Sequence, residues 1–100
     1  MIEFSKKQME IIDILVRDNG EQYNMLKASE ECQELGLALV QKVLKPTKVD
    51  IQEIYDEIGD VAIRLEILKK MFPEGEIQKR IDYKLSKFKE YQDHKLYKQI

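Results

Sequence analysis

Apolar side chains recur at intervals of three and four residues along most of the chain, and this helical period constrains the fold more than any other feature. Three breakers interrupt it: Asn19-Gly20, Pro46, and Pro73 with Gly75. Proline cannot continue a helix, and glycine readily adopts the left-handed conformation that ends one. The pattern therefore predicts four helices, one ending at residue 19 and the others covering about 22–44, 51–71 and 76 onward.

Capping residues support two of these boundaries. Ser5 followed by Gln8, and Asp50 followed by Glu53, both match the capping box that begins many helices. The connections between the helices are short, which favours antiparallel neighbours. We expect an all-α, four-helix bundle-like fold that forms a single domain over residues 1–100.

The composition argues against several functional classes. A formal net charge of -2 gives no basic excess for binding duplex DNA. The apolar run at residues 37–40 is far too short to span a membrane, and the N-terminus does not have the pattern of a signal peptide. The single cysteine, Cys32, cannot form an intramolecular disulfide, and its place in an apolar arc predicts a buried side chain. These features favour a soluble cytoplasmic protein.

Two acidic pairs, each spaced i, i+3, are the main candidates for chemistry: Glu31 with Glu34, and Glu57 with Asp60. On a helical wheel, Glu31 and Glu57 each lie at the edge of an apolar stripe, and their partners continue outward on the same side. The stripes are Ala28, Cys32, Leu35 and Leu39 in one helix, and Ile51, Ile54, Ile58, Val61, Leu65 and Leu68 in the next. If the stripes pack together, the four carboxylates converge where the core meets solvent.

Converging carboxylates suit Mg²⁺, which prefers oxygen ligands and retains waters or substrate phosphates in its remaining positions. Without a cation, the same groups would repel and raise one another's pKa. The alternative is that both pairs belong to solvated helix faces, as most acidic pairs do in a chain with 19 Asp and Glu residues. The residues alone thus indicate a metal site and leave its substrate open.

Residues 27–35, KASEECQEL, followed by residues 56–61, DEIGDV, resemble the MazG-like all-α nucleoside triphosphate pyrophosphohydrolases, in particular their compact, phage-type members. The family pattern is EExxE followed by ExxD, and both halves are present in order. The resemblance implies hydrolysis between the α- and β-phosphates of (deoxy)nucleoside triphosphates, with Mg²⁺ or alternatively Mn²⁺ as cofactor. Glu31, Glu34, Glu57 and Asp60 match the catalytic metal ligands, and Glu30 matches the leading glutamate of the motif, for which we expect a structural role or support of a metal ligand.

Other residues are candidates for binding the substrate. Lys84 and Lys87 could place positive charge near a triphosphate, although a solvated basic face is the equal alternative. Gln22 could reach the nucleotide from the start of its helix. Arg64, one turn beyond Asp60, fits an ion-pair partner that orients a ligand carboxylate, or else a phosphate contact.

A second apolar stripe on the helix over residues 22–44 indicates an oligomer, because a helix that is apolar on two faces is usually buried on both. The stripe consists of Leu26, Leu37, Val40 and Leu44. The resemblance likewise implies a homodimer or homotetramer. Two alternatives to the enzyme remain: a catalytically silent nucleotide- or metal-binding protein, and a helical interaction module whose acidic residues only confer solubility.

Overall fold

The computed structural model describes residues 2–99, and the side chains of residues 2–95. This part of the chain contains no strand and four helices: α1 (Lys6–Asn19), α2 (Glu21–Leu44), α3 (Ile51–Met71) and α4 (Glu74–Gln99). The predicted all-α fold of four helices is therefore confirmed. The boundaries match the breakers closely, and α4 begins two residues earlier than expected, directly after Pro73.

The helix starts follow from their capping side chains. At α1, the Gln8 backbone N–H donates to Ser5 Oγ at 3.1 Å, and the Ser5 N–H donates to Gln8 Oε1 at 2.8 Å, which completes the predicted capping box. At α3, Asp50 is the N-cap as predicted, but its carboxylate accepts from the Gln52 N–H at 3.0 Å. The prediction of a capping box with Glu53 was therefore wrong, and a single side-chain hydrogen bond caps the start of α3.

A sharp corner at Gly20 joins α1 to α2. Its φ of 81° and ψ of 165° lie in a region that residues with a Cβ rarely adopt. Asn24 locks the corner, since its fully buried side chain donates from Nδ2 to the backbone oxygen of Leu15 at 3.2 Å. The end of α1 is thereby fixed against the first turn of α2.

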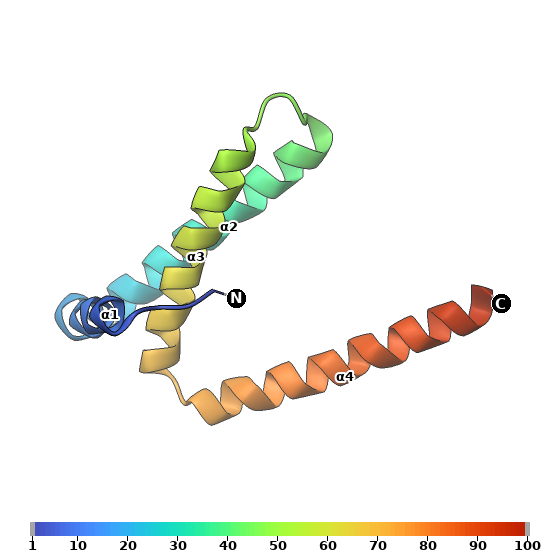
Figure 1. Ribbon diagram of the computed structural model, residues 1–100. Coiled ribbons are helices and arrows are strands. Elements are labelled where there is room, and N and C mark those ends of the chain that lie inside the picture. The colour runs from blue at the N-terminus through green and yellow to red at the C-terminus, as the bar shows by residue number, and fades with distance from the viewer. Residues whose placement is uncertain (1, 100) are drawn as a thin grey trace.

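Helices α2 and α3 form an antiparallel hairpin, which is the centre of the structure (Figure 1). Lys42 closes its loop, because its Nζ donates to the backbone oxygens of Pro46 at 3.0 Å and Val49 at 2.8 Å. Val49 is buried beneath that loop. The hairpin register that brings the acidic residues together is therefore held at this end by one lysine side chain.

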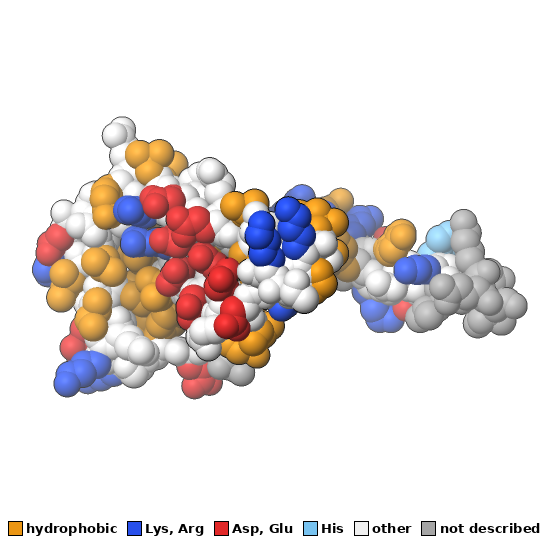
Figure 2. Space-filling view, turned by 90° about the horizontal axis from the view of Figure 1, so that it is seen from above, with side chains coloured by type: hydrophobic (Ala, Val, Ile, Leu, Met, Phe, Trp, Pro, Cys, Tyr) orange, Lys and Arg blue, Asp and Glu red, His pale blue; other side chains and the backbone are white. Residues whose placement is uncertain are grey.

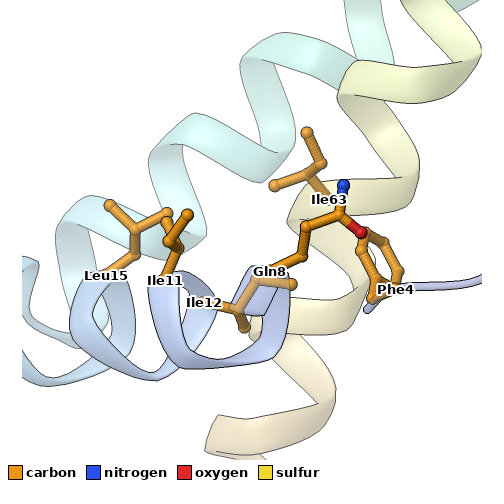
Figure 3. Close-up of a pocket in the computed structure, with 6 residues that line it drawn as sticks. All are labelled: Phe4, Gln8, Ile11, Ile12, Leu15 and Ile63. Carbon is orange, nitrogen blue, oxygen red and sulfur yellow. The ribbon is translucent and has the colours of Figure 1, made fainter. Parts of the chain in front are cut away.

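Helix α1 packs on α3 and completes the small core. Ile12 of α1 and Ile67 of α3 are both buried, and Lys70 Nζ lies 3.7 Å from Asp13 Oδ1. A pocket beside this contact is lined by Phe4, Gln8, Ile11, Ile12, Leu15 and Ile63 (Figure 3). It contains no charged side chain, so it does not suit a phosphate-bearing ligand.

Helix α4 leaves the far end of α3 and runs away from the hairpin (Figure 1). It contacts α3 only near their junction and touches neither α1 nor α2 within the described residues. The side chains of residues 78–95 are all exposed. The radius of gyration is 17.2 Å, against about 13 Å for a compact domain of this length. The single chain thus has the helices of a bundle without their full mutual packing.

None of the described helices has a stretch long and apolar enough to cross a membrane.

Candidate metal centre

The residues of α2 and α3 that face each other across the hairpin line a seam between the two helices. This seam is not centred on the apolar stripes read from the sequence, because each helix is rotated about its axis relative to that expectation. On α3, Ile54 and Val61 are buried as expected, whereas Ile51, Ile58 and Leu65 are 39–49% exposed. Our predicted stripe was therefore wrong in part. The reason is that the apolar arc of each helix is wider than one neighbouring helix can cover, so that only the part of the arc nearest the acidic residues is buried between α2 and α3.

Because of this rotation, Glu31 and Glu57 lie in the seam itself and not at the edge of the core, where the sequence pattern placed them. Glu31 lies one turn from buried Ala28 on α2, and Glu57 lies between buried Ile54 and Val61 on α3. Both glutamates are half-buried. Asp60, one turn beyond Glu57, is exposed at the mouth of the seam.

Three of the four predicted ligands converge. One carboxylate oxygen from each of Glu31, Glu57 and Asp60 lies within 4.8 Å of the other two. The seam therefore concentrates three negative charges supplied by two helices. Around them, acidic side chains form a band on one face of the molecule, with hydrophobic side chains on both sides of it (Figure 2).

One oxygen of each glutamate in the seam is not satisfied by the protein. Glu31 Oε2 and Glu57 Oε2 are both buried and have no hydrogen-bond partner. Desolvation raises the pKa of Glu31, and repulsion from Glu34 and Asp60 adds to the increase. Desolvation also raises the pKa of Glu57, with further contributions from Asp60 and Glu31. Buried carboxylate oxygens without donors cost free energy, which a bound cation would offset.

Glu34 and Glu30 lie outside this trio. Glu34 is exposed, one turn beyond Glu31, and both its charge and a side-chain hydrogen bond with Glu31 help to raise the pKa of Glu31, although its oxygens are not part of the cluster. Glu30 is exposed and pairs with Lys27, whose Nζ lies 3.2 Å from Glu30 Oε2. The structure thus places Glu30 apart from the cluster.

Arg64 is half-buried on the inner face of α3, four residues beyond Asp60. Its Nη1 is buried without a hydrogen-bond partner, and Arg64 takes part in none of the ion pairs found in the described part of the chain. The predicted ion pair with a ligand carboxylate is therefore not formed in this structure. A guanidinium in this state is available to an anion.

Lys27 is a residue that we did not single out from the sequence. It is half-buried, four residues before Glu31, and the positive charge of Arg64 acts against the pKa increase that its pairing with Glu30 produces. Because α2 and α3 are antiparallel, Lys27 and Arg64 lie toward the same end of the seam, each about 6 Å along its helix from a clustered carboxylate. Its i, i+4 relation to Glu31 could have identified it.

The remaining predicted substrate contacts do not reach the cluster in a single chain. Lys84 and Lys87 are exposed on α4, which does not touch α2. Their charges lie over the rings of Phe88 and Tyr83, at 5.1 Å and 5.7 Å. Gln22 is exposed on the outer side of α2, where it lines a shallow apolar pocket with Met25 and Leu26.

Cys32 is exposed, so the prediction that it is buried was wrong for the isolated chain.

The donor set suits a hard divalent cation. All three clustered groups are carboxylates, and such oxygen-only sets favour Mg²⁺, Ca²⁺ or Mn²⁺ over metals that prefer nitrogen or sulfur. In an octahedral Mg²⁺ site, adjacent ligand oxygens lie about 3 Å apart and opposite ones about 4.2 Å apart. The three oxygens of the cluster lie within 4.8 Å of one another, a looser arrangement than that spacing, so the fit to the ion rests on the donor chemistry and on the two buried oxygens without partners.

Comparisons with protein-family models, with curated proteins and with solved structures find no match for this chain.

Proposed function

We propose that this chain is a Mg²⁺-dependent nucleoside triphosphate pyrophosphohydrolase, which forms a nucleoside monophosphate and pyrophosphate. The observation that carries the proposal is the carboxylate cluster, in which two buried oxygens lack any partner within the protein. A solvated acidic face would leave such oxygens in water. The EExxE and ExxD motifs supply the substrate class, since the same residues resemble the ligands of the MazG-like enzymes.

Glu31, Glu57 and Asp60 would hold the metal. When bound, Mg²⁺ would polarise a phosphoryl oxygen and lower the pKa of a coordinated water. The protein contributes the fixed spacing of the three carboxylates, which the Lys42 loop closure and the Asn24 corner maintain from opposite ends of the hairpin. Glu34 lies beside the cluster and outside it, and we assign it to orienting the attacking water.

Lys27 and Arg64 would bind the phosphate chain. A triphosphate carries more negative charge than one divalent ion neutralises, and the three clustered carboxylates add to that charge. The two cations lie toward the same end of the seam, so the phosphates would extend from the carboxylates toward them. Arg64 is the stronger candidate, because a guanidinium can donate two parallel hydrogen bonds to a phosphate.

A product-resolved screen of canonical, deoxy and modified triphosphates with Mg²⁺ tests the proposal. We expect pyrophosphate rather than orthophosphate as the inorganic product. Glu57→Gln is expected to lower the rate on the order of a hundredfold, because it removes a charged ligand at almost constant volume. Glu53→Gln, an exposed change one turn earlier on the same helix, serves as the matched control and is expected to retain activity.

Orthophosphate as the only product, or equal rates for Glu57→Gln and the wild type, would contradict the proposal. If no triphosphate is hydrolysed but Mg²⁺ with a triphosphate raises the melting temperature, the chain is a silent binder. If neither happens, the acidic residues belong to a helical interaction module.

A further inference from the structure

Tyr23 begins a row of three side chains on α2 that ends at the carboxylate cluster. Tyr23, Lys27 and Glu31 are spaced four residues apart, so they are neighbours along one side of the helix. Lys27 and Tyr23 lie about 6 Å and about 12 Å from Glu31 along the helix axis. The row therefore follows the direction in which the phosphates would extend from the carboxylates.

The ring of Tyr23 is accessible and lies beside the ammonium group of Lys27. Tyr23 is 46% exposed, and Lys27 Nζ lies 6.0 Å from the centre of its ring. The hydrogen bond and the charge of Glu30 raise the pKa of Lys27. Tyr23 adds to this increase in the pKa, and the positive charge of Arg64 acts against it. Lys27 is thus close to the ring and to both of these charged groups at the same time.

The contacts that hold Lys27 in the free protein are weak. Its ion pair with Glu30, in which Nζ lies 3.2 Å from Oε2, and its contact with the ring of Tyr23 are both open to solvent. Such contacts contribute less than charge-assisted hydrogen bonds to a phosphate. When Lys27 turns toward a bound phosphate, the face of the Tyr23 ring that it covers becomes free.

A nucleotide is long enough to reach from the cluster to this ring. Six single bonds of about 1.5 Å separate the α-phosphorus from the nitrogen that carries the base, so this nitrogen lies within roughly 9 Å of the phosphorus. A phosphate beside Lys27 and Arg64 therefore places the base within reach of a side chain one turn farther along α2. In the other direction, Glu34 and Glu53 add negative charge next to the cluster, which disfavours phosphates there.

We propose that Tyr23 stacks on the nucleobase of the triphosphate and makes the site tolerant of different bases. The inference rests on the proposed function, because it takes the phosphates to lie between Glu31 and Lys27. Stacking does not read the edges of a base, since every base has a ring face. The site should accept purine and pyrimidine triphosphates, and it should bind purines more tightly because their two rings stack over a larger area.

The two neighbours of Tyr23 in the sequence do not read the base in its place. Gln22 is nine residues from Glu31, which is two and a half turns, and thus lies on the opposite side of α2. Asn24 is fully buried, and its Nδ2 donates to the backbone oxygen of Leu15 at 3.2 Å. Of these three consecutive residues, only Tyr23 offers a base an accessible surface on the side of the cluster.

Binding of a triphosphate that cannot be cleaved between its α- and β-phosphates tests this inference separately from hydrolysis. Calorimetry with Mg²⁺ compares α,β-methylene-ATP with inorganic tripolyphosphate, which lacks the nucleoside. Tyr23→Ala should weaken binding of the nucleotide on the order of tenfold and leave binding of tripolyphosphate unchanged. Tyr23→Phe should bind both ligands like the wild type, because it keeps the ring. Tyr91→Ala, which changes an exposed tyrosine of α4 away from α2, is the matched control and should also bind both normally.

Three results would overturn the inference: equal losses for the nucleotide and tripolyphosphate in Tyr23→Ala, no loss for either ligand, or a wild type that binds neither. A wild type that binds the nucleotide through Tyr23 and hydrolyses no triphosphate would support the inference and contradict only the proposed function.

Two further measurements keep the test valid if Tyr23→Ala fails to fold. In NMR spectra of protein with labelled tyrosine rings, the nucleotide should shift one ring resonance upfield and tripolyphosphate should not, and this resonance should be missing from Tyr23→Phe. The adenine and guanine analogues should bind the wild type within about threefold of each other, and both more tightly than the cytosine analogue. An unshifted Tyr23 ring, or a preference of more than about tenfold between adenine and guanine, would overturn the inference.

Discussion

Glu31 of α2 and Glu57 of α3 meet in the seam of the hairpin, and each has a buried carboxylate oxygen without a hydrogen-bond partner. Their position is unfavourable for folding in the absence of a cation, because burial and mutual repulsion both disfavour the charged form. If the cluster binds a cation as proposed, the free protein gives up stability here to obtain that affinity.

The stability of the protein should depend on pH through Glu31 and Glu57. The pKa values of Glu31 and Glu57 are raised above the ordinary 4.5, so between pH 4.5 and the raised values the folded protein holds protons that the unfolded chain has released. The free energy of unfolding contributed by these groups therefore falls as pH rises through that window, and then levels off. Glu57→Gln, measured with EDTA, should raise the melting temperature at pH 7 and make little difference near pH 4. Glu53 is the weakest of the four carboxylates that raise the pKa of Glu57, so Glu53→Gln should show a much smaller contrast of the same sign. A destabilised Glu57→Gln at pH 7 would refute this account.

Variants of Arg64 allow substrate binding and metal binding to be tested separately. If its unpaired guanidinium binds phosphate, Arg64→Gln should raise KM for the triphosphate on the order of tenfold or more, and Arg64→Lys should recover only part of that loss. Divalent metal affinity in the absence of nucleotide should stay unchanged. A weakened metal affinity in Arg64→Gln would instead assign the residue to orienting a ligand carboxylate.

Asn24 holds the corner between α1 and α2. Asn24→Ala removes the hydrogen bond to the Leu15 backbone oxygen and the fully buried amide that fills the corner, so we expect a loss of about 1–3 kcal/mol in the free energy of unfolding. Urea denaturation measures it. Gln33→Ala, an exposed truncation on the same helix, is the comparison and should change stability by less than about 0.5 kcal/mol. Equal effects would show that the corner does not depend on this bond.

Gly20 is required by its backbone conformation. A Cβ at this position would meet no neighbouring atom, so the cost of Gly20→Ala comes from the positive φ alone and should be about 1–3 kcal/mol. Gly75→Ala also has open space around its Cβ and has no positive φ, so it should be neutral or slightly stabilising. The difference between the two variants in thermal unfolding measures the free-energy cost of the positive φ at residue 20.

Much of this fold could be predicted from local rules. Ser5, Gly20, Asp50 and Pro73 set helix ends within two residues, because capping and proline chemistry depend only on neighbouring residues. The convergence of Glu31, Glu57 and Asp60 also followed from their helical spacing.

The rotation of the helices could not be predicted in the same way. An amphipathic pattern shows how wide the apolar arc is, and the neighbouring helices decide which part of that arc is covered. Glu57 thus lies deeper, and Ile58 more exposed, than a wheel centred on hydrophobicity suggests. For the same reason, the distance of Lys84 from the cluster could not be predicted, since the direction of α4 depends on contacts beyond the helix itself.

The central claim is that the seam cluster binds a divalent cation, and titration with Mn²⁺ followed by the EPR signal of the free ion tests it most directly. We predict about one Mn²⁺ bound per chain, because the three carboxylates supply one set of ligands, and displacement of the Mn²⁺ by excess Mg²⁺. This binding should be lost in Glu57→Gln and kept in Glu53→Gln. Equal binding by the wild type and Glu57→Gln, or no binding by either, would contradict the account.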